Sequence, residues 1–132
     1  MKYIYTATFT PMEDGPGYYA SVPNLEGCIS TGNSLSDAID QITDAASIWL
    51  VSAEDDGEEI PAPTPQADMK HDDSAVYSLI KVDTLAYRAL IDDRAVRKNV
   101  SLPAWMANLA DKRKINVSQV LQDALMRKLE TA

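Results

Sequence analysis

Three polar side chains recur at every second position near the C-terminal end of the chain: Arg97, Asn99 and Ser101. On an extended strand they share one face, whereas Val100 and Leu102 share the other. A guanidinium group pairs with guanine edges, an amide with adenine edges and a hydroxyl with either, and a two-stranded ribbon fits the major groove of DNA. The spacing therefore predicts that these three side chains contact bases. The simpler alternative is a dimerisation ribbon with exposed polar groups.

A second set of residues is suited to a DNA phosphate. Asn116, Val117 and Ser118 form the first turn of an expected helix, where free backbone N–H groups can hold an anion. Lys114 precedes this turn in the basic cluster 112–114 and adds electrostatic attraction. We therefore expect these four residues to bind the phosphate backbone.

The charge of the chain is divided unevenly between its two ends. Residues 1–93 contain 17 Asp and Glu against 4 Lys and Arg, a net charge of −13. Residues 94–132 contain 3 against 8, a net charge of +5. Such asymmetry indicates a different partner for each end, with a polyanion suited to the basic tail only.

The tail is predicted to form one strand and two short amphipathic helices. The strand is expected over residues 95–102, a first helix from Pro103, which suits the first helical position, and a second helix after the N-cap Asn116. Fewer than 40 residues in such elements cannot bury enough apolar surface, and a lone strand has no partner. Antiparallel pairing with a second copy solves both problems, so we predict a homodimer or a higher homo-oligomer.

The acidic part of the chain predicts a small sheet covered by one helix, in the order β-β-β-α-β. Ser34 has the type and position of a helix N-cap, with the Asp37 carboxylate placed to reach back to it, and Gly57 lies where the helix must stop. The fold class is therefore α+β. The expected strands cover residues 3–10, 18–22, 28–31 and 76–82. The expected domains are residues 1–83 and 94–132, joined by a connector of about two helical turns at 84–93.

Several strings in the acidic part resemble the HicB antitoxin family. They are Val22–Gly32 (VPNLEGCISTG), Ser34–Ala38 (SLSDA) and Asp56–Pro61 (DGEEIP). The resemblance implies a partial ribonuclease H-like domain without catalysis. It also implies that this domain binds HicA, a small basic toxin that cleaves messenger RNA, and covers the toxin's active histidine.

The C-terminal strings Lys98–Pro103 (KNVSLP) and Asn116–Leu125 (NVSQVLQDAL) resemble a ribbon-helix-helix repressor domain. The resemblance assigns base contacts to the outward strand residues and a phosphate clamp to the start of the second helix. Two residues depart from the family: Lys98 takes a position that is usually apolar, and Lys114 stands where a glycine is common.

Two groups in the acidic domain are candidates for toxin contacts. Tyr18 and Tyr19 have aromatic rings that suit interface anchors, and Glu54, Asp55 and Asp56 form an acidic stretch that a basic protein would meet. The alternatives are half-buried strand tyrosines and a solvated helix end.

Catalytic and metal chemistry is not expected from this sequence. Ribonuclease H chemistry needs carboxylates around two metals, typically with one on the first strand, but residues 3–10 contain none. His71 is the single histidine and Cys28 the single cysteine, so a metal site would lack ligands. We predict no cofactor, no metal and no enzymatic activity. The absence of a signal-peptide pattern and of an apolar run near ~20 residues indicates a cytoplasmic protein without membrane association.

Two functions remain open. The first is an antitoxin that neutralises a HicA-type toxin and represses its own operon by binding operator DNA. The second is an orphan ribbon-helix-helix transcription regulator whose acidic domain senses a ligand or another protein. A third, a nuclease in its own right, is disfavoured by the missing carboxylates.

Overall fold

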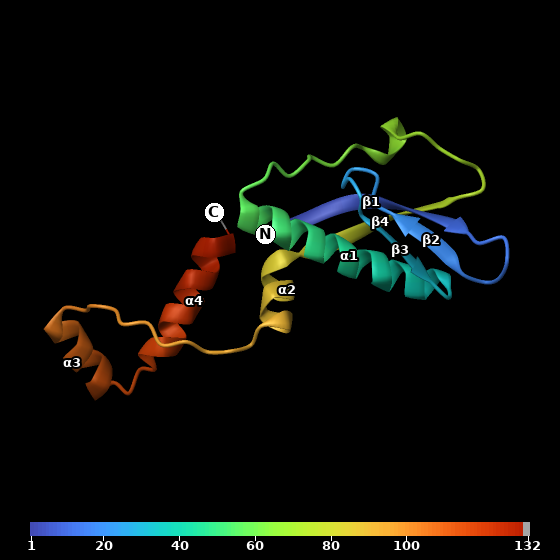
Figure 1. The fold of residues 1–132 in the computed structure, drawn as a ribbon. Helices are drawn as coiled ribbons and strands as arrows, with labels where there is room; N and C mark the ends of the chain where they lie inside the picture. Colours follow the sequence, from blue (N-terminus) through green and yellow to red (C-terminus); the bar gives the residue numbers. More distant parts are fainter. Residues whose placement is uncertain (131–132) are drawn as a thin grey trace. The chain divides into compact units, whose positions relative to one another are not determined.

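The structure is a computed structural model that describes residues 1–130; positions 131–132, the end of the expected C-terminal domain, lie outside the described residues. The chain divides into two units, Lys2–Ala89 and a second that begins at Leu90 (Figure 1). Among the described residues, no helix is long and apolar enough to cross a bilayer. The strands are β1 (Lys2–Pro11), β2 (Tyr18–Ser21), β3 (Ile29–Gly32) and β4 (Val76–Asp83); the α-helices are α1 (Leu35–Asp56), α2 (Thr84–Ile91), α3 (Ala104–Lys112) and α4 (Val117–Glu130).

The first unit contains a four-stranded antiparallel sheet in the order β3-β2-β1-β4. The register places Phe9 opposite Ala20 on β2 and Tyr5 opposite Ile80 on β4. Because side chains alternate along a strand, these residues and Ala7 all point to the same face, where they are buried. All four strands predicted for the acidic part of the chain and the α+β class are confirmed, with strand ends shifted by one residue.

Helix α1 covers the buried face of this sheet (Figure 1). Ser34 caps its start, since its Oγ accepts a hydrogen bond from the Asp37 backbone N–H at 3.1 Å. The Asp37 carboxylate reaches back one residue further than expected and accepts from the Asn33 N–H at 2.8 Å. The helix ends at Gly57, whose φ of 67° lies in the left-handed region that glycine adopts freely.

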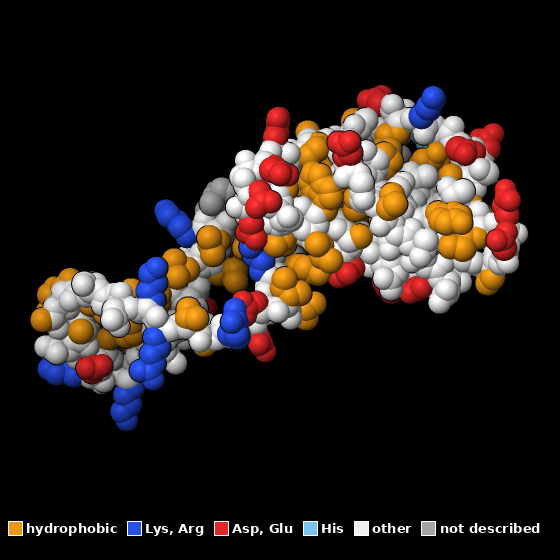
Figure 2. Space-filling view, viewed as in Figure 1, with side chains coloured by type: hydrophobic (Ala, Val, Ile, Leu, Met, Phe, Trp, Pro, Cys, Tyr) orange, Lys and Arg blue, Asp and Glu red, His pale blue; other side chains and the backbone are white. Residues whose placement is uncertain are grey.

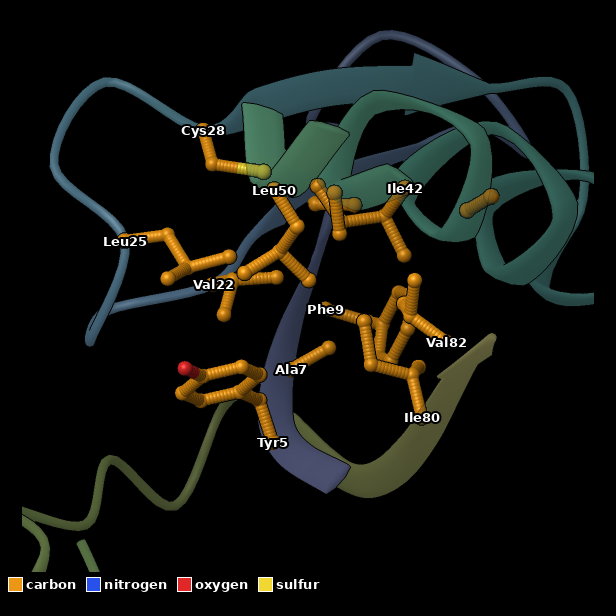
Figure 3. Packing of buried hydrophobic residues seen from close by; sticks show 13 residues of the cluster. Tyr5, Ala7, Phe9, Val22, Leu25, Cys28, Ile42, Leu50, Ile80 and Val82 are labelled. Carbon is orange, nitrogen blue, oxygen red and sulfur yellow. The ribbon is translucent and has the colours of Figure 1, made fainter. Parts of the chain in front are cut away.

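The core lies between α1 and the sheet and consists mainly of apolar side chains (Figure 3). Phe9, Ile42 and Leu50 are completely buried, and Cys28 packs among them as a small apolar group. Gly32 allows the sheet to approach α1 closely, because a Cβ at this position would lie 2.2 Å from the Ala38 backbone nitrogen. The seam between β3 and α1 therefore requires glycine.

The proline-rich segment between α1 and β4, residues 58–75, forms an ordered loop that returns to the sheet. Its only regular piece is a single 3-10 turn, η1, over Gln66–Asp68. Thr64 exchanges two hydrogen bonds with the Asn24 side chain, at 2.9 and 3.2 Å, and the Tyr5 hydroxyl donates to the Pro61 carbonyl. These contacts hold the loop against the sheet even though it lacks regular structure.

Helix α2 follows β4 directly and belongs largely to the first unit. Thr84 is fully buried, and Arg88 pairs with two carboxylates at the end of α1. The first unit therefore extends to Ala89, so residues 84–89 of the expected connector are docked onto it. The segment between the two units is thus shorter than the expected connector 84–93.

The second unit contains α3 and α4. Pro103 stands at the N-cap of α3, one position before the expected one, and Asn116 caps α4 as predicted, since its Oδ1 accepts from the Gln119 N–H at 3.1 Å. Residues 92–103 have no regular secondary structure, so the strand expected over residues 95–102 is not formed within one chain. A ribbon pairs strands from two copies, and a single chain contains only one of them.

Candidate functional site

The face of the sheet that points away from α1 has an open area over β2, β3 and the second half of β1. It forms a shallow depression of about 450 Å³ with hydroxyl and apolar side chains. Tyr19 and Ile29 stand out from it, with exposed fractions of 57% and 72%. We call this area the open sheet surface; its residues are Thr8, Thr10, Tyr19, Ser21, Ile29 and Thr31.

The remaining part of the same face is covered by the proline-rich loop. Pro63–Gln66 lie next to Ile4, Thr6 and Leu79, and Thr6 is almost completely buried although it points away from the core. The loop therefore covers Thr6 on the β1–β4 half of this face, while Ile4 and Leu79 beside it stay 49% and 61% exposed.

The first unit carries a strong net negative charge. No Lys or Arg occurs between Lys2 and Lys70, a stretch that contains twelve Asp and Glu residues. Figure 2 shows acidic side chains distributed over this unit and basic side chains gathered mainly in the C-terminal part of the chain. The unit as a whole, Lys2–Ala89, has 15 Asp and Glu against 4 Lys and Arg, a net charge of −11. A polyanion would be repelled by this surface.

The two candidate tyrosines lie on opposite faces of the sheet. Tyr18 pairs with Pro11, is partly buried and packs against the buried cluster on the core side of the sheet. Tyr19 pairs with Thr10 and points outward into the open sheet surface. Of this pair, only Tyr19 is placed to contact another protein.

Glu54 is engaged inside its own domain. Its carboxylate accepts hydrogen bonds from the Tyr3 hydroxyl at 2.7 Å, the Thr84 hydroxyl at 2.9 Å and the Arg88 guanidinium at 3.1 Å. Burial by itself raises the pKa of Glu54, but these hydrogen bonds outweigh it and hold the pKa below its usual range. Burial and the hydrogen bond to Glu54 raise the pKa of Tyr3 to about 12. Glu54 thus joins β1, α1 and α2.

The rest of the acidic stretch is more accessible. Asp55 pairs with Arg88 at 2.8 Å, and Asp56 is exposed at the last residue of α1. Since α1 covers the opposite face of the sheet, this stretch and Tyr19 do not form one continuous site. We did not predict partner contacts for Ile29, Thr8, Thr10 and Thr31, although the alternation of threonines along residues 6–10 indicates a polar face of the strand.

The predicted base-contacting residues lie in the segment without regular structure. Arg97, Asn99 and Ser101 are all exposed. The predicted phosphate site begins at Lys114, whose φ of 53° is the left-handed conformation that glycine favours. Asn116 uses its side chain to cap α4, and Val117 and Ser118 form the exposed first turn of that helix.

The second unit lacks a core of its own. Over residues 92–130, only Ala107, Ala110 and Leu121 are partly shielded, and every other residue is exposed. Trp105, for example, exposes 65% of its surface although it lies on the apolar side of α3. Such a stripe needs a covering surface, because two short helices alone cannot shield it.

Groups with catalytic potential are dispersed across the described residues. Within residues 1–130, no three His, Cys, Asp or Glu side chains are placed to hold one metal ion. His71 packs against the Tyr77 ring with 4.9 Å between centroids. Burial raises the pKa of the Cys28 thiol, which disfavours the reactive thiolate.

Comparison with known proteins connects most of the chain to one family. The family model described as the HicB-like antitoxin of bacterial toxin–antitoxin systems matches residues 5–128. An uncharacterised 14.9 kDa protein from Haemophilus phage HP1 is 39% identical over 49 residues, 37% of each chain, so the match spans little more than a third of that protein's length.

Two solved structures share the fold. One is a toxin–antitoxin complex from Streptococcus pneumoniae, with 22% identity, 97% of this chain and 99% of the other covered, and a TM-score of 0.58. The other is the antitoxin HicB of Burkholderia pseudomallei, with 22% identity, 98% of each chain covered and a TM-score of 0.53.

Proposed function

The chain belongs to the HicB-like antitoxin family of bacterial toxin–antitoxin systems, and from this premise we propose that it binds and neutralises a HicA-type toxin that cleaves messenger RNA. The main support for this proposal is the family match, which spans both units from residue 5 to residue 128. The charge of the first unit supports the same partner. A protein that binds RNA presents a basic surface, and a unit of charge −11 competes with the RNA backbone for it.

Neutralisation is tested by co-expression. Each HicA-type protein encoded in the genome that carries this chain's gene is induced alone and together with the full chain. We expect growth arrest by the toxin alone, recovery with the full chain, and a complex of the two proteins on size exclusion. Arrest that persists despite normal expression of the chain, with no complex formed, would contradict the antitoxin function.

For the second unit, we propose homodimerisation and binding to operator DNA through a ribbon-helix-helix arrangement. Its apolar stripes are uncovered and its segment 95–102 is unpaired in one chain, which is what a unit completed by a second copy requires. Its net charge of +5 suits DNA. In the dimer, Arg97, Asn99 and Ser101 would contact bases, while Lys114, Asn116, Val117 and Ser118 would contact phosphates.

The DNA-binding proposal is tested with the promoter region upstream of the gene. We expect a dimer in sedimentation experiments and salt-dependent binding to that DNA. Arg97→Ala should cost about 1–3 kcal/mol and relax specificity at one base pair, because a bidentate guanine contact is lost. If Arg97→Ala binds every DNA sequence as tightly as the parent chain does, the ribbon does not contact bases.

The alternative function is an orphan regulator whose first unit senses a ligand or another protein. The co-expression experiment separates the two, since an orphan regulator would bind DNA and leave every HicA-type toxin active. In either case we propose a cytoplasmic protein that acts by binding and performs no catalysis of its own.

A further inference from the structure

We propose that the open sheet surface is the docking site for a basic protein, the toxin of the proposed function on which this inference rests. The surface is defined by Thr8, Thr10, Tyr19, Ser21, Ile29 and Thr31. The proposal therefore assigns the toxin to the face of the sheet opposite α1.

The side chains of this surface have the composition of a protein interface. Tyr19 and Ile29 offer apolar area on neighbouring strands, and both are more than half exposed. The threonine and serine hydroxyls between them can donate and accept hydrogen bonds, so that a partner's polar groups remain satisfied on docking. Because these groups are held on strands with a defined register, little ordering is needed on binding.

The choice of partner follows from charge. The strands β1, β2 and β3, which form the open sheet surface, contain a single charged residue, Lys2, at the far end of β1. Glu13 and Asp14 lie in the turn that joins β1 to β2. A second copy of this unit would bring another charge of −11 and would be repelled, as would a nucleic acid. A basic protein alone gains electrostatic attraction here together with apolar contact.

The other surfaces of the first unit are partly used by contacts within the unit. On the other half of the same sheet face, Pro63–Gln66 lie against the strands and bury Thr6, and the end of α1 uses Glu54 and Asp55 to bind Arg88. The accessible half of the sheet thus combines exposed aromatic and aliphatic groups with free hydroxyls. This combination directs the partner to Tyr19 and Ile29.

A matched pair of substitutions tests the site in the full chain. Ile29→Lys places a positive charge on the open sheet surface, at its β3 edge, and Ile48→Lys makes the same change on the opposite side of the unit, at a position 53% exposed on α1. Binding to a HicA-type toxin from the same genome is measured by calorimetry. We expect at least about a tenfold weaker affinity for Ile29→Lys and a change within about twofold for Ile48→Lys.

The outcomes separate this inference from the proposed function. If the parent chain binds the toxin and Ile29→Lys binds equally well, the surface assignment is wrong while the antitoxin function stands; if the parent chain binds no HicA-type toxin, the function itself fails. A change of oligomeric state of Ile29→Lys without toxin would identify a second copy as the occupant and overturn the proposal. Should Ile29→Lys fail to fold, hydroxyl-radical labelling of the parent decides: protection of Tyr19 in the complex supports the site, and unchanged labelling refutes it.

Discussion

The Arg88 guanidinium on α2 lies 3.1 Å from the Glu54 carboxylate on α1 and uses its other terminal nitrogen to bind Asp55 at 2.8 Å. These two ion pairs attach α2, where the connection between the units starts, to the end of α1. Thr84, at the first residue of α2, donates to the same Glu54 carboxylate and is fully buried. The junction is therefore part of the folded first unit.

Removal of Arg88 should loosen this junction. We expect Arg88→Met to lower the free energy of unfolding of the first unit by about 1–2 kcal/mol, because Glu54 and Asp55 lose a charged hydrogen-bond donor. Amide hydrogen exchange over residues 84–89 should accelerate. Arg94→Met is the control, since Arg94 pairs with Asp92 on an exposed surface, and it should change stability by less than about 0.5 kcal/mol. Equal effects of the two variants would contradict a fastening role for Arg88.

Because of the Tyr3–Glu54 hydrogen bond, the stability of the first unit should decrease both in acid and in alkali. Glu54 has a lowered pKa, so its contribution is present above the usual glutamate pKa and is lost as pH falls through the folded value. Tyr3 has a raised pKa of about 12, so its contribution is complete below its ordinary value of 10.0 and is lost as pH rises from there toward about 12.

Denaturant unfolding across pH checks both limits, with Trp105 replaced by Phe so that Trp49 alone reports on the first unit. We expect the stability gap between the parent and Glu54→Gln to be largest near neutral pH and to shrink in acid. The loss between pH 10 and about 12 should be smaller in Tyr3→Phe. A gap that stays constant from neutral to acid pH would show that the Glu54 charge contributes nothing.

Gly32 should not tolerate a side chain. The Cβ of alanine would lie 2.2 Å from the Ala38 nitrogen and 2.5 Å from its Cα, so β3 and α1 would have to separate. We expect Gly32→Ala to destabilise the first unit by about 3 kcal/mol, measured by denaturant unfolding. Gly15→Ala serves as the control, because nothing lies within 4 Å of a Cβ there. Similar stabilities of the two variants would refute the close packing of this seam.

Lys114→Gly should affect folding and DNA binding in opposite directions. Glycine adopts the left-handed backbone of residue 114 without strain, so the proposed dimer should gain up to about 1 kcal/mol. The loss of one cation near the phosphate site should reduce the slope of log affinity against log salt by about 1. Thermal unfolding and DNA titrations at several salt concentrations measure the two effects. Lys70→Gly, in the loop of the first unit, should leave the slope unchanged; an unchanged slope for Lys114→Gly would remove this residue from the phosphate site.

Much of the first unit could be predicted because its signals are local. The β-branched and aromatic residues along positions 3–10 indicated a strand, and Ser34 and Gly57 marked both ends of α1 through their capping chemistry. The same holds for Asn116 at the start of α4. The pairing partner of residues 95–102 was predicted to be another copy, and a single chain does not contain it.

The candidate contacts were harder to predict because side chains of one type were assigned different roles by the fold. Tyr18 and Tyr19 are adjacent, yet one packs in the core and the other is exposed on the open sheet surface. Glu54 was grouped with its neighbours as an acidic surface, but it bonds to Tyr3, Thr84 and Arg88. Nothing in the sequence near Arg88 indicated this partnership.

By itself the sequence determined the strands and helices of the first unit, the capping residues and the division of charge between the two ends. These properties depend on residues within a few positions of one another, or on composition alone. Only the tertiary structure decided which face of the sheet is open, where the proline-rich loop covers it, and that α2 is fastened to α1. The reason is distance along the chain: Tyr3 and Arg88 meet Glu54 across 51 and 34 residues, and no local pattern specifies such contacts.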